Sequence, residues 1–121
     1  MYLFEIKGKE HELKITLASV KYLNGVKEGG AFSLIHSAIT GDIETFIDIV
    51  FAGLFHTNEG YRKADVEEAI EQLIVEEKLD LDTINKTSYG VMAESFFYKA
   101  TFNKMFATDP EAKKQIEEMM K

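Results

Sequence analysis

The residues of this chain that could do chemistry are three histidines, a group of glutamates and a few scattered serines. His11, His36 and His56 lack the spacing of a metal site, because none lies four residues from another histidine or in an H-E-x-x-H frame. We interpret all three as structural residues. His56 lies near the end of a predicted central helix, where an imidazole can bind free carbonyl groups.

The glutamates between residues 67 and 77 lie mostly on the outer side of a predicted amphipathic helix, where their neighbours are also mostly acidic. Acid–base catalysis requires a pocket that shifts a carboxyl pKa, and the sequence shows no sign of one. The serines have no G-x-S-x-G context, and residues 29–30 are not followed by the Lys-Ser/Thr of a phosphate loop. The sequence therefore predicts no enzyme, no metal and no cofactor.

Composition narrows the class of protein. The chain has 121 residues, a net charge of -7, 45% hydrophobic residues and no cysteine. We expect one domain over residues 1–121, without disulfides. An acidic chain is a poor ligand for nucleic acid or for an anionic membrane surface. The longest apolar run, residues 49–55, is too short for a membrane span, and no signal-peptide pattern is present. We expect a cytoplasmic protein.

The N-terminal segment predicts a β-hairpin. Residues 2–7 and 11–17 alternate between apolar and polar side chains, and glycine in the first loop position at residues 8–9 favours a type II′ turn. This turn would place Phe4 opposite Leu13. Because a lone hairpin is marginal in water, it must lie on the helices or pair with the edge of a partner.

The most hydrophobic stretch, residues 41–57, predicts a central helix over about 42–56 that begins after Thr40 or Asp42. Ile49 and Phe55 point well away from its main apolar stripe, and we expect the helix to leave them uncovered. A helix that is apolar on nearly two faces is wrapped by other elements. Its inward stripe is formed by Ile43, Phe46, Ile47, Val50 and Leu54.

The rest of the chain predicts further helices, so the expected fold is mainly α: an N-terminal β-hairpin (about 2–17) and a compact bundle of five to six helices. We expect Ser19 to cap the first helix and residues 24–25 to end it. Asp109 and Pro110 have the pattern of an N-cap and a first helical residue. Besides the central helix, the predicted helices cover residues 20–23, 31–39, 65–78, 83–107 and a C-terminal segment from residue 110.

The helix predicted over residues 83–107 has apolar side chains on two sides, and Gly90 is expected to kink or split it. One side carries Ile84, Val91, Tyr98, Phe102, Met105 and Phe106; the opposite side carries Tyr89, Ala93, Phe96, Phe97 and Ala100. The second side is either core or a contact surface for another chain, because so small a chain has few elements to cover two buried helices. The candidate interface residues are Tyr89, Phe96, Phe97, Ile49 and Phe55.

Several segments together resemble one family. In chain order they read IKGKEHELK, KYLN, GDIETFIDIVFAGLFHT, ADVEEAIEQLI, AESFFYK and DPEAKKQIEE. They resemble phage tail assembly chaperones, small acidic proteins of long-tailed phages and prophages of Gram-positive hosts. The resemblance covers nearly the whole chain and rests on order, length and composition together.

The resemblance implies a non-enzymatic role in tail assembly. Such chaperones bind the tape measure protein and keep it soluble and extended until tail tube protein polymerises around it. They are mostly helical and form homo-oligomers, as rings or spirals. The resemblance brings no catalytic residues or short binding motif, so the interface residues above are inferred from the apolar pattern alone.

Two alternatives stand beside this interpretation. One is a small acidic helical module, a transcription regulator or an adaptor, although the acidic helix 65–78 is a poor recognition helix for DNA. The other is an enzyme of a phage or prophage, which would need a deep pocket holding His56 beside a carboxylate of shifted pKa.

Overall fold

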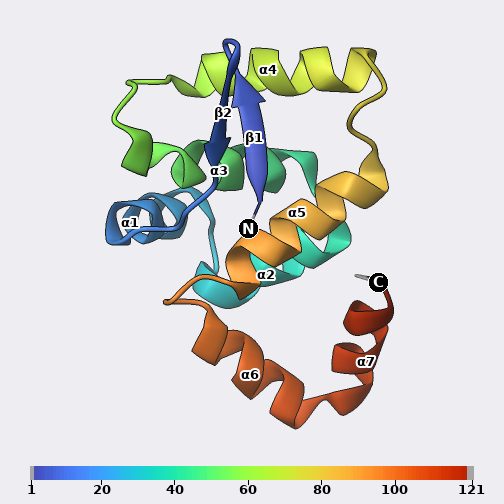
Figure 1. Ribbon diagram of the computed structural model, residues 1–121. Coiled ribbons are helices and arrows are strands. Elements are labelled where there is room, and N and C mark those ends of the chain that lie inside the picture. The colour runs from blue at the N-terminus through green and yellow to red at the C-terminus, as the bar shows by residue number, and fades with distance from the viewer. Residues whose placement is uncertain (1, 120–121) are drawn as a thin grey trace.

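A computed structural model gives the fold of residues 2–119, with the side chains of residues 31, 32, 105, 112, 115, 116 and 119 left undescribed. The prediction of a mainly helical fold behind an N-terminal hairpin is confirmed (Figure 1). The elements are β1 (Leu3–Ile6), β2 (Lys9–Glu12), α1 (Leu17–Val26), α2 (Gly30–Thr40), α3 (Ile43–Gly53), a 3₁₀ turn (Phe55–Thr57), α4 (Lys63–Val75), α5 (Leu81–Ala93), α6 (Lys99–Thr108) and α7 (Pro110–Met119).

The hairpin turn lies one residue earlier than predicted. β1 and β2 are antiparallel with Ile6 opposite Lys9, so the turn residues are Lys7 and Gly8. Both have positive φ, 51° and 78°, as in the type I′ turn that matches the twist of the strands. The type II′ turn predicted at residues 8–9 is wrong, because Lys7 adopts a left-handed conformation that the pattern assigned only to glycine.

The strand register is shifted from the prediction by two residues. Phe4 lies opposite His11 and not opposite Leu13. Because side chains alternate with a period of two, a shift of two leaves every side chain on its predicted face. Phe4, Ile6 and Leu13 are accordingly all buried. Sequence alternation therefore identified the buried face of the hairpin but not its pairing.

α1 begins before the predicted start, because Thr16 and not Ser19 is its N-cap. The Ser19 N–H donates to Thr16 Oγ1 at 3.3 Å, and the Thr16 N–H donates to Ser19 Oγ at 3.0 Å, which is a capping box. The helix also continues through residues 24–25, predicted to end it. The buried Ser19 hydroxyl donates to the Ala52 carbonyl at 2.7 Å and thereby joins α1 to α3.

α3 is the central helix, as predicted, and contacts α1, α2, α4 and α5 (Figure 1). Asp42 caps it by accepting from the Thr45 N–H at 3.0 Å, and the hydroxyl and amide bonds from Thr45 lower the pKa of Asp42. The helix ends at Gly53 and not at residue 56. The Gly53 carbonyl accepts from the Lys14 N–H at 3.0 Å, so this helix end bonds to the segment after β2.

Two expectations about α3 are wrong. Ile43 is 41% exposed, because it is the first residue of the helix and lies beyond the elements that cover the middle. Ile49, expected to be uncovered, has no exposed surface, because helices pack on α3 from several sides. The remaining predicted stripe is buried: Phe46, Ile47, Val50 and Leu54.

α4 covers residues 63–75 and not 65–78, and it buries Val66 and Ile70 as predicted. It ends in a Schellman motif, in which the Lys78 N–H donates to the Leu73 carbonyl at 2.9 Å. The left-handed residue of this motif is Glu77, with φ of 60°. Glycine usually occupies this position, so the sequence contained no signal for the end of the helix.

The predicted helix 83–107 is two helices, separated by residues 94–98. In this turn Ser95 Oγ accepts from the Phe97 N–H at 3.3 Å. The turn places Tyr98 in the core with no exposed surface, whereas Phe96 is 66% exposed. The turn therefore separates Tyr98, from one predicted apolar side, from Phe96, from the other.

Gly90 neither kinks nor splits α5 but makes room for the hairpin. It lies inside the helix, and a Cβ added there would overlap the ring of Tyr2. A glycine in a strand or helix interior often marks such a close approach of another group. The residue before β1 therefore packs directly on the surface of α5.

α6 and α7 lie on the side of α2 and α5 that faces away from α4 (Figure 1). α6 contacts both α5 and α7. Phe102 anchors α6 in the core, since it is buried and its ring packs edge-on against Tyr89 with centroids 5.1 Å apart.

Asp65 joins the hairpin turn to α4. It accepts from the Arg62 N–H at 2.9 Å, its other oxygen lies 3.3 Å from Lys7 Nζ, and its side chain is only 8% exposed. The amide and guanidinium of Arg62, in that order, and then Lys7 lower the pKa of Asp65 to about 2. The charged carboxylate is therefore the form that the fold stabilises.

Stability is expected to fall with Asp65 protonation below about pH 4. Because the folded pKa, about 2, lies below the ordinary value of 3.8, the unfolded chain binds the proton first. The stabilisation is complete above about pH 4 and is lost as the pH falls toward 2. Asp65→Asn should lower Tm at pH 7 and flatten the Tm profile between pH 4 and pH 2. Asp82→Asn, at an exposed carboxylate paired with Lys86, is the control, and equal flattening in both variants would contradict the assignment.

Candidate interaction surface

Two of the predicted interface residues form an exposed aromatic pair. Phe96 and Phe97 lie in the turn after α5 and are 66% and 42% exposed. Phe96 lines a pocket of about 320 Å³ between the segment after β2 and the end of α5. Phe97 packs edge-on against Tyr98, with ring centroids 5.0 Å apart. We call Phe96 and Phe97 the aromatic turn.

The other predicted interface residues lie elsewhere. Tyr89 is half-buried against Phe102 and is not part of an open patch. Ile49 is fully buried and is left out of the surface proposed below. Phe55, in the 3₁₀ turn after α3, lines a second pocket. The five residues therefore do not form one continuous face.

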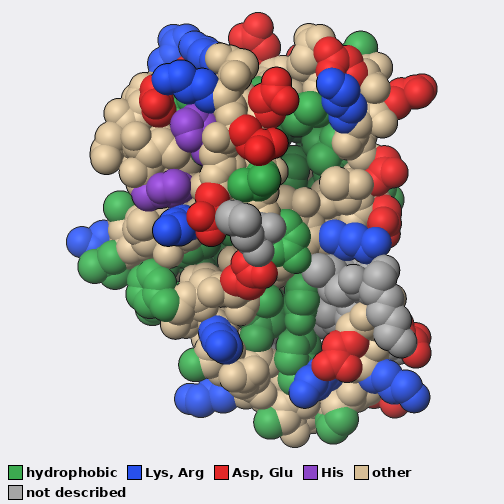
Figure 2. Space-filling model, viewed as in Figure 1, with side chains coloured by type: hydrophobic (Ala, Val, Ile, Leu, Met, Phe, Trp, Pro, Cys, Tyr) green, Lys and Arg blue, Asp and Glu red, His purple; other side chains and the backbone are tan. Residues whose placement is uncertain are grey.

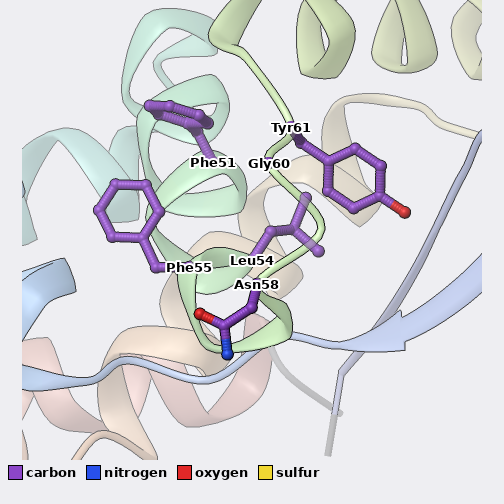
Figure 3. Close-up of a pocket in the computed structure, with 6 residues that line it drawn as sticks. All are labelled: Phe51, Leu54, Phe55, Asn58, Gly60 and Tyr61. Atoms are coloured by element: carbon purple, nitrogen blue, oxygen red, sulfur yellow. The ribbon is translucent and has the colours of Figure 1, made fainter.

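The second pocket has a volume of about 330 Å³ and lies beside the C-terminal end of α3 (Figure 3). Its aromatic wall contains Phe51 and Phe55, whose rings are edge-on with centroids 5.1 Å apart. Tyr22 of α1 packs edge-on against both rings, at 5.3 and 5.5 Å. The pocket is lined by Phe51, Leu54, Phe55, Asn58, Gly60 and Tyr61.

A polar group borders this aromatic wall. Asp48 accepts from the Tyr22 hydroxyl at 2.9 Å and lies 3.0 Å from Lys63 Nζ. Burial, followed by the bond to Asp48, raises the pKa of Tyr22, and the bond to Asp48 raises the pKa of Lys63. Tyr22 is therefore neutral and Lys63 charged at neutral pH. An apolar pocket with a polar border suits the binding of an apolar side chain.

Sequence reasoning missed Tyr61, which lines this pocket, and Tyr22, which packs against its two phenylalanines. Phe51 and Phe55 lie four residues apart, a spacing that indicates neighbouring side chains. Nothing in the sequence places Tyr22 beside them, because α1 and α3 meet only through tertiary packing. Phe55 was found from its position off the main stripe of the central helix.

Two of the three histidines, His11 and His56, form hydrogen bonds that join distant segments. His11 Nε2 lies 2.8 Å from the Tyr61 hydroxyl, His36 is exposed, and His56 Nε2 lies 2.6 Å from the Glu12 carbonyl oxygen. His56 therefore binds a carbonyl of β2 and not one of its own helix. Among the residues that the structure describes, no three His, Cys, Asp or Glu side chains cluster as metal ligands.

Figure 2 shows hydrophobic side chains gathered between the hairpin and α6, with acidic side chains over the hairpin. In the part of the chain that the structure describes, no helix has the length and apolar character needed to cross a bilayer. The exposed aromatic turn and the open aromatic pocket are features of surfaces that contact other proteins. Fold and surface together thus define a small, mainly helical protein with exposed aromatic side chains.

Comparison with known families identifies the family of this protein. The family model described as phage tail assembly chaperone protein, TAC, matches residues 3–107, from β1 into α6. The chain belongs to the phage tail assembly chaperone family, and the resemblance inferred from its sequence is confirmed. No curated protein and no solved structure gives a significant match.

Proposed function

We propose that this chain binds the tape measure protein of its phage and keeps it soluble and extended until tail tube protein polymerises around it. Membership of the tail assembly chaperone family supports this proposal. The observation that carries it is the aromatic turn, where Phe96 and Phe97 are adjacent in sequence and both exposed. Adjacent exposed aromatic rings of this kind commonly anchor a protein partner.

The physical basis is a contact between an apolar surface and an amphipathic helix. A long helical tape measure protein exposes apolar stripes that aggregate in water unless they are covered. The aromatic turn and the pocket at Phe55 would receive side chains from such a stripe, as in helix-in-groove binding. The net charge of -7 keeps the chaperone itself soluble while these surfaces are open.

We further propose that several copies act together, as a ring or spiral in the cytoplasm of the host cell. Many weak contacts along an oligomer hold a long client more tightly than one contact does. Weak individual contacts would also let tail tube protein displace the chaperone stepwise as the tube grows. The copies would then be released in order along the client.

Co-expression tests this proposal. Tape measure protein produced alone is expected to be found in the insoluble fraction, and co-expression with this chain should move most of it into the soluble fraction and into one complex by size-exclusion chromatography. The control is co-expression with Phe46→Ala, a variant weakened in the core. A tape measure protein whose solubility is unchanged by the wild-type chain would disprove the function.

A further inference from the structure

Strand β1 has a free hydrogen-bonding edge. In a two-residue hairpin the pair beside the turn, Ile6 and Lys9, exchanges the ladder hydrogen bonds, and the next pair does not. The Leu13 N–H donates to the Tyr2 carbonyl at 2.8 Å, which fits this alternation. Leu3 and Glu5 therefore direct their N–H and C=O groups away from β2, and no residue that the structure describes bonds to these four groups.

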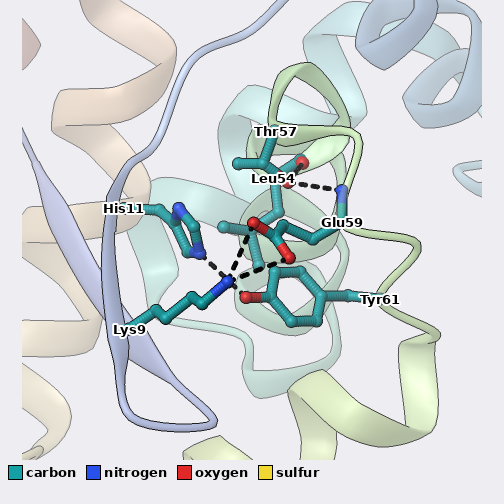
Figure 4. A network of polar contacts seen from close by, with 6 residues as sticks. All are labelled: Lys9, His11, Leu54, Thr57, Glu59 and Tyr61. Carbon is teal, nitrogen blue, oxygen red and sulfur yellow. Dashed lines mark hydrogen bonds and ion pairs between the residues drawn. The ribbon is translucent and has the colours of Figure 1, made fainter.

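The opposite edge of the hairpin is partly covered by the segment after α3 (Figure 4). The Glu12 carbonyl is bound by His56 at 2.6 Å, and His11 meets the Tyr61 hydroxyl at 2.8 Å. Lys9 Nζ lies 3.3 Å from Glu59 Oε1. The segment after α3 thus holds β2 from the side through these polar contacts. Among the described residues, β1 contacts α4 but makes no such polar contacts at its outer edge.

A groove runs beside the free edge. Glu5 and the hairpin turn form one side of a hollow of about 260 Å³, and the second half of α4 forms the other. Ala69 and Leu73 of α4 are partly buried apolar residues that pack on the core and line this hollow. A strand added to β1 would direct alternate side chains toward Ala69 and Leu73 in this hollow, which Gln72, Glu76 and Lys78 also line.

The outward face of the hairpin is acidic. Glu5 lies directly opposite Glu10, and Glu12 lies opposite Leu3 on the same face. Like charges directly opposite are unfavourable, and among the described residues no cation lies within ion-pair distance of these three glutamates. Lys7, the nearest lysine of the turn, is already paired with Asp65 at 3.3 Å. A cationic side chain beside Glu5 would relieve this repulsion.

We propose that the β1 edge binds an extended basic segment of a partner protein, which adds to the hairpin as a third strand. Main-chain bonds to Leu3 and Glu5 would give the affinity, outward lysine or arginine side chains would meet the acidic face, and inward apolar ones would enter the groove. A second copy of this chain is a poorer occupant, because its hairpin would bring three further glutamates, one from β1 and two from β2, to the same face. This site is separate from the aromatic turn and goes beyond the proposed function.

A proline substitution that blocks the β1 edge tests the proposal. The probe is a fluorescently labelled peptide of about ten residues that alternates lysine and valine, long enough for one strand. Glu5→Pro removes an N–H that points away from β2, so the hairpin ladder stays intact. Glu10→Pro is the matched control, because it removes a glutamate from the same face but leaves the β1 edge free. Fluorescence anisotropy should show binding by the wild type, a loss of at least about tenfold in Glu5→Pro, and nearly unchanged binding in Glu10→Pro.

Further controls make each outcome decisive. Unfolding curves of both variants check the fold. If Glu5→Pro is unfolded, Glu5→Lys replaces it, and reversal of the charge beside the free edge should weaken binding at least about fivefold at low salt. Absence of binding by the wild type, or equal binding by both proline variants, would overturn the proposal. So would equal binding of a peptide of the same charge with proline at alternate positions, since that result would indicate charge attraction alone. Wild-type dimerisation that is lost in Glu5→Pro, without peptide binding, would assign the edge to a second copy.

Discussion

Phe46→Ala is expected to lower the free energy of unfolding by about 3–5 kcal/mol. Phe46 is 1% exposed and lies in α3, the helix on which α1, α2, α4 and α5 pack. Removing its ring deletes buried apolar contacts and leaves a cavity that rigid helices cannot close. Urea unfolding followed by circular dichroism measures the loss. For a domain of this size the change is a large part of the total stability.

Ile43→Ala is the matched control in the same helix. Sequence periodicity assigned Ile43 and Phe46 to one buried stripe, but Ile43 is 41% exposed. Alanine also has the higher helix propensity, so the expected change is within about 0.5 kcal/mol. A loss in Ile43→Ala comparable to that in Phe46→Ala would mean that the end of α3 is covered.

Substitutions in the aromatic turn are expected to act on client binding and not on folding. Phe96→Ser and Phe97→Ser should each weaken binding to tape measure protein by about 2 kcal/mol, roughly 30-fold. Phe96, 66% exposed, gives the clearer test because its removal opens no core cavity. The thermal midpoint of Phe96→Ser should stay close to that of the wild type. Isothermal titration with a soluble tape measure fragment measures the affinity.

Val75→Ser provides the comparison for these variants. Val75 is a large apolar side chain, 72% exposed at the end of α4, so its substitution removes a similar kind of surface away from the aromatic turn. Its affinity should match that of the wild type. If all three variants bind equally well, the aromatic turn is not the client site. If all three lose affinity alike, the client contacts the apolar surface without preference.

Several elements could be predicted because their signals are local. The Asp109–Pro110 pattern marked the start of α7, and Asp42 was one of the two caps expected for α3. Hydrophobic periodicity separated Tyr98 and Phe102, which are buried, from Phe96, which is exposed. Each of these features depends on residues within a few positions of one another.

Other features could not be predicted because they arise from contacts between distant segments. α4 ends at a left-handed Glu77 without glycine. Gly90 leaves room for the ring of Tyr2, whereas its expected role was to kink or split the helix. The aromatic pocket depends on Tyr22, which α1 brings to Phe51 across the core. No pattern within one segment carries this information.

The sequence by itself determined the mainly helical class, the central position of α3, the buried face of the hairpin and the resemblance to the tail assembly chaperone family. The first three follow from period and composition, which depend on the side chains of one segment, whereas the resemblance rests on several segments taken in order. Only the tertiary structure decided which apolar residues are free. Ile49 is covered and Phe96 is open, although both lie off the main stripe of their segments. Exposure depends on which other elements pack on a face, and that packing is a property of the whole chain.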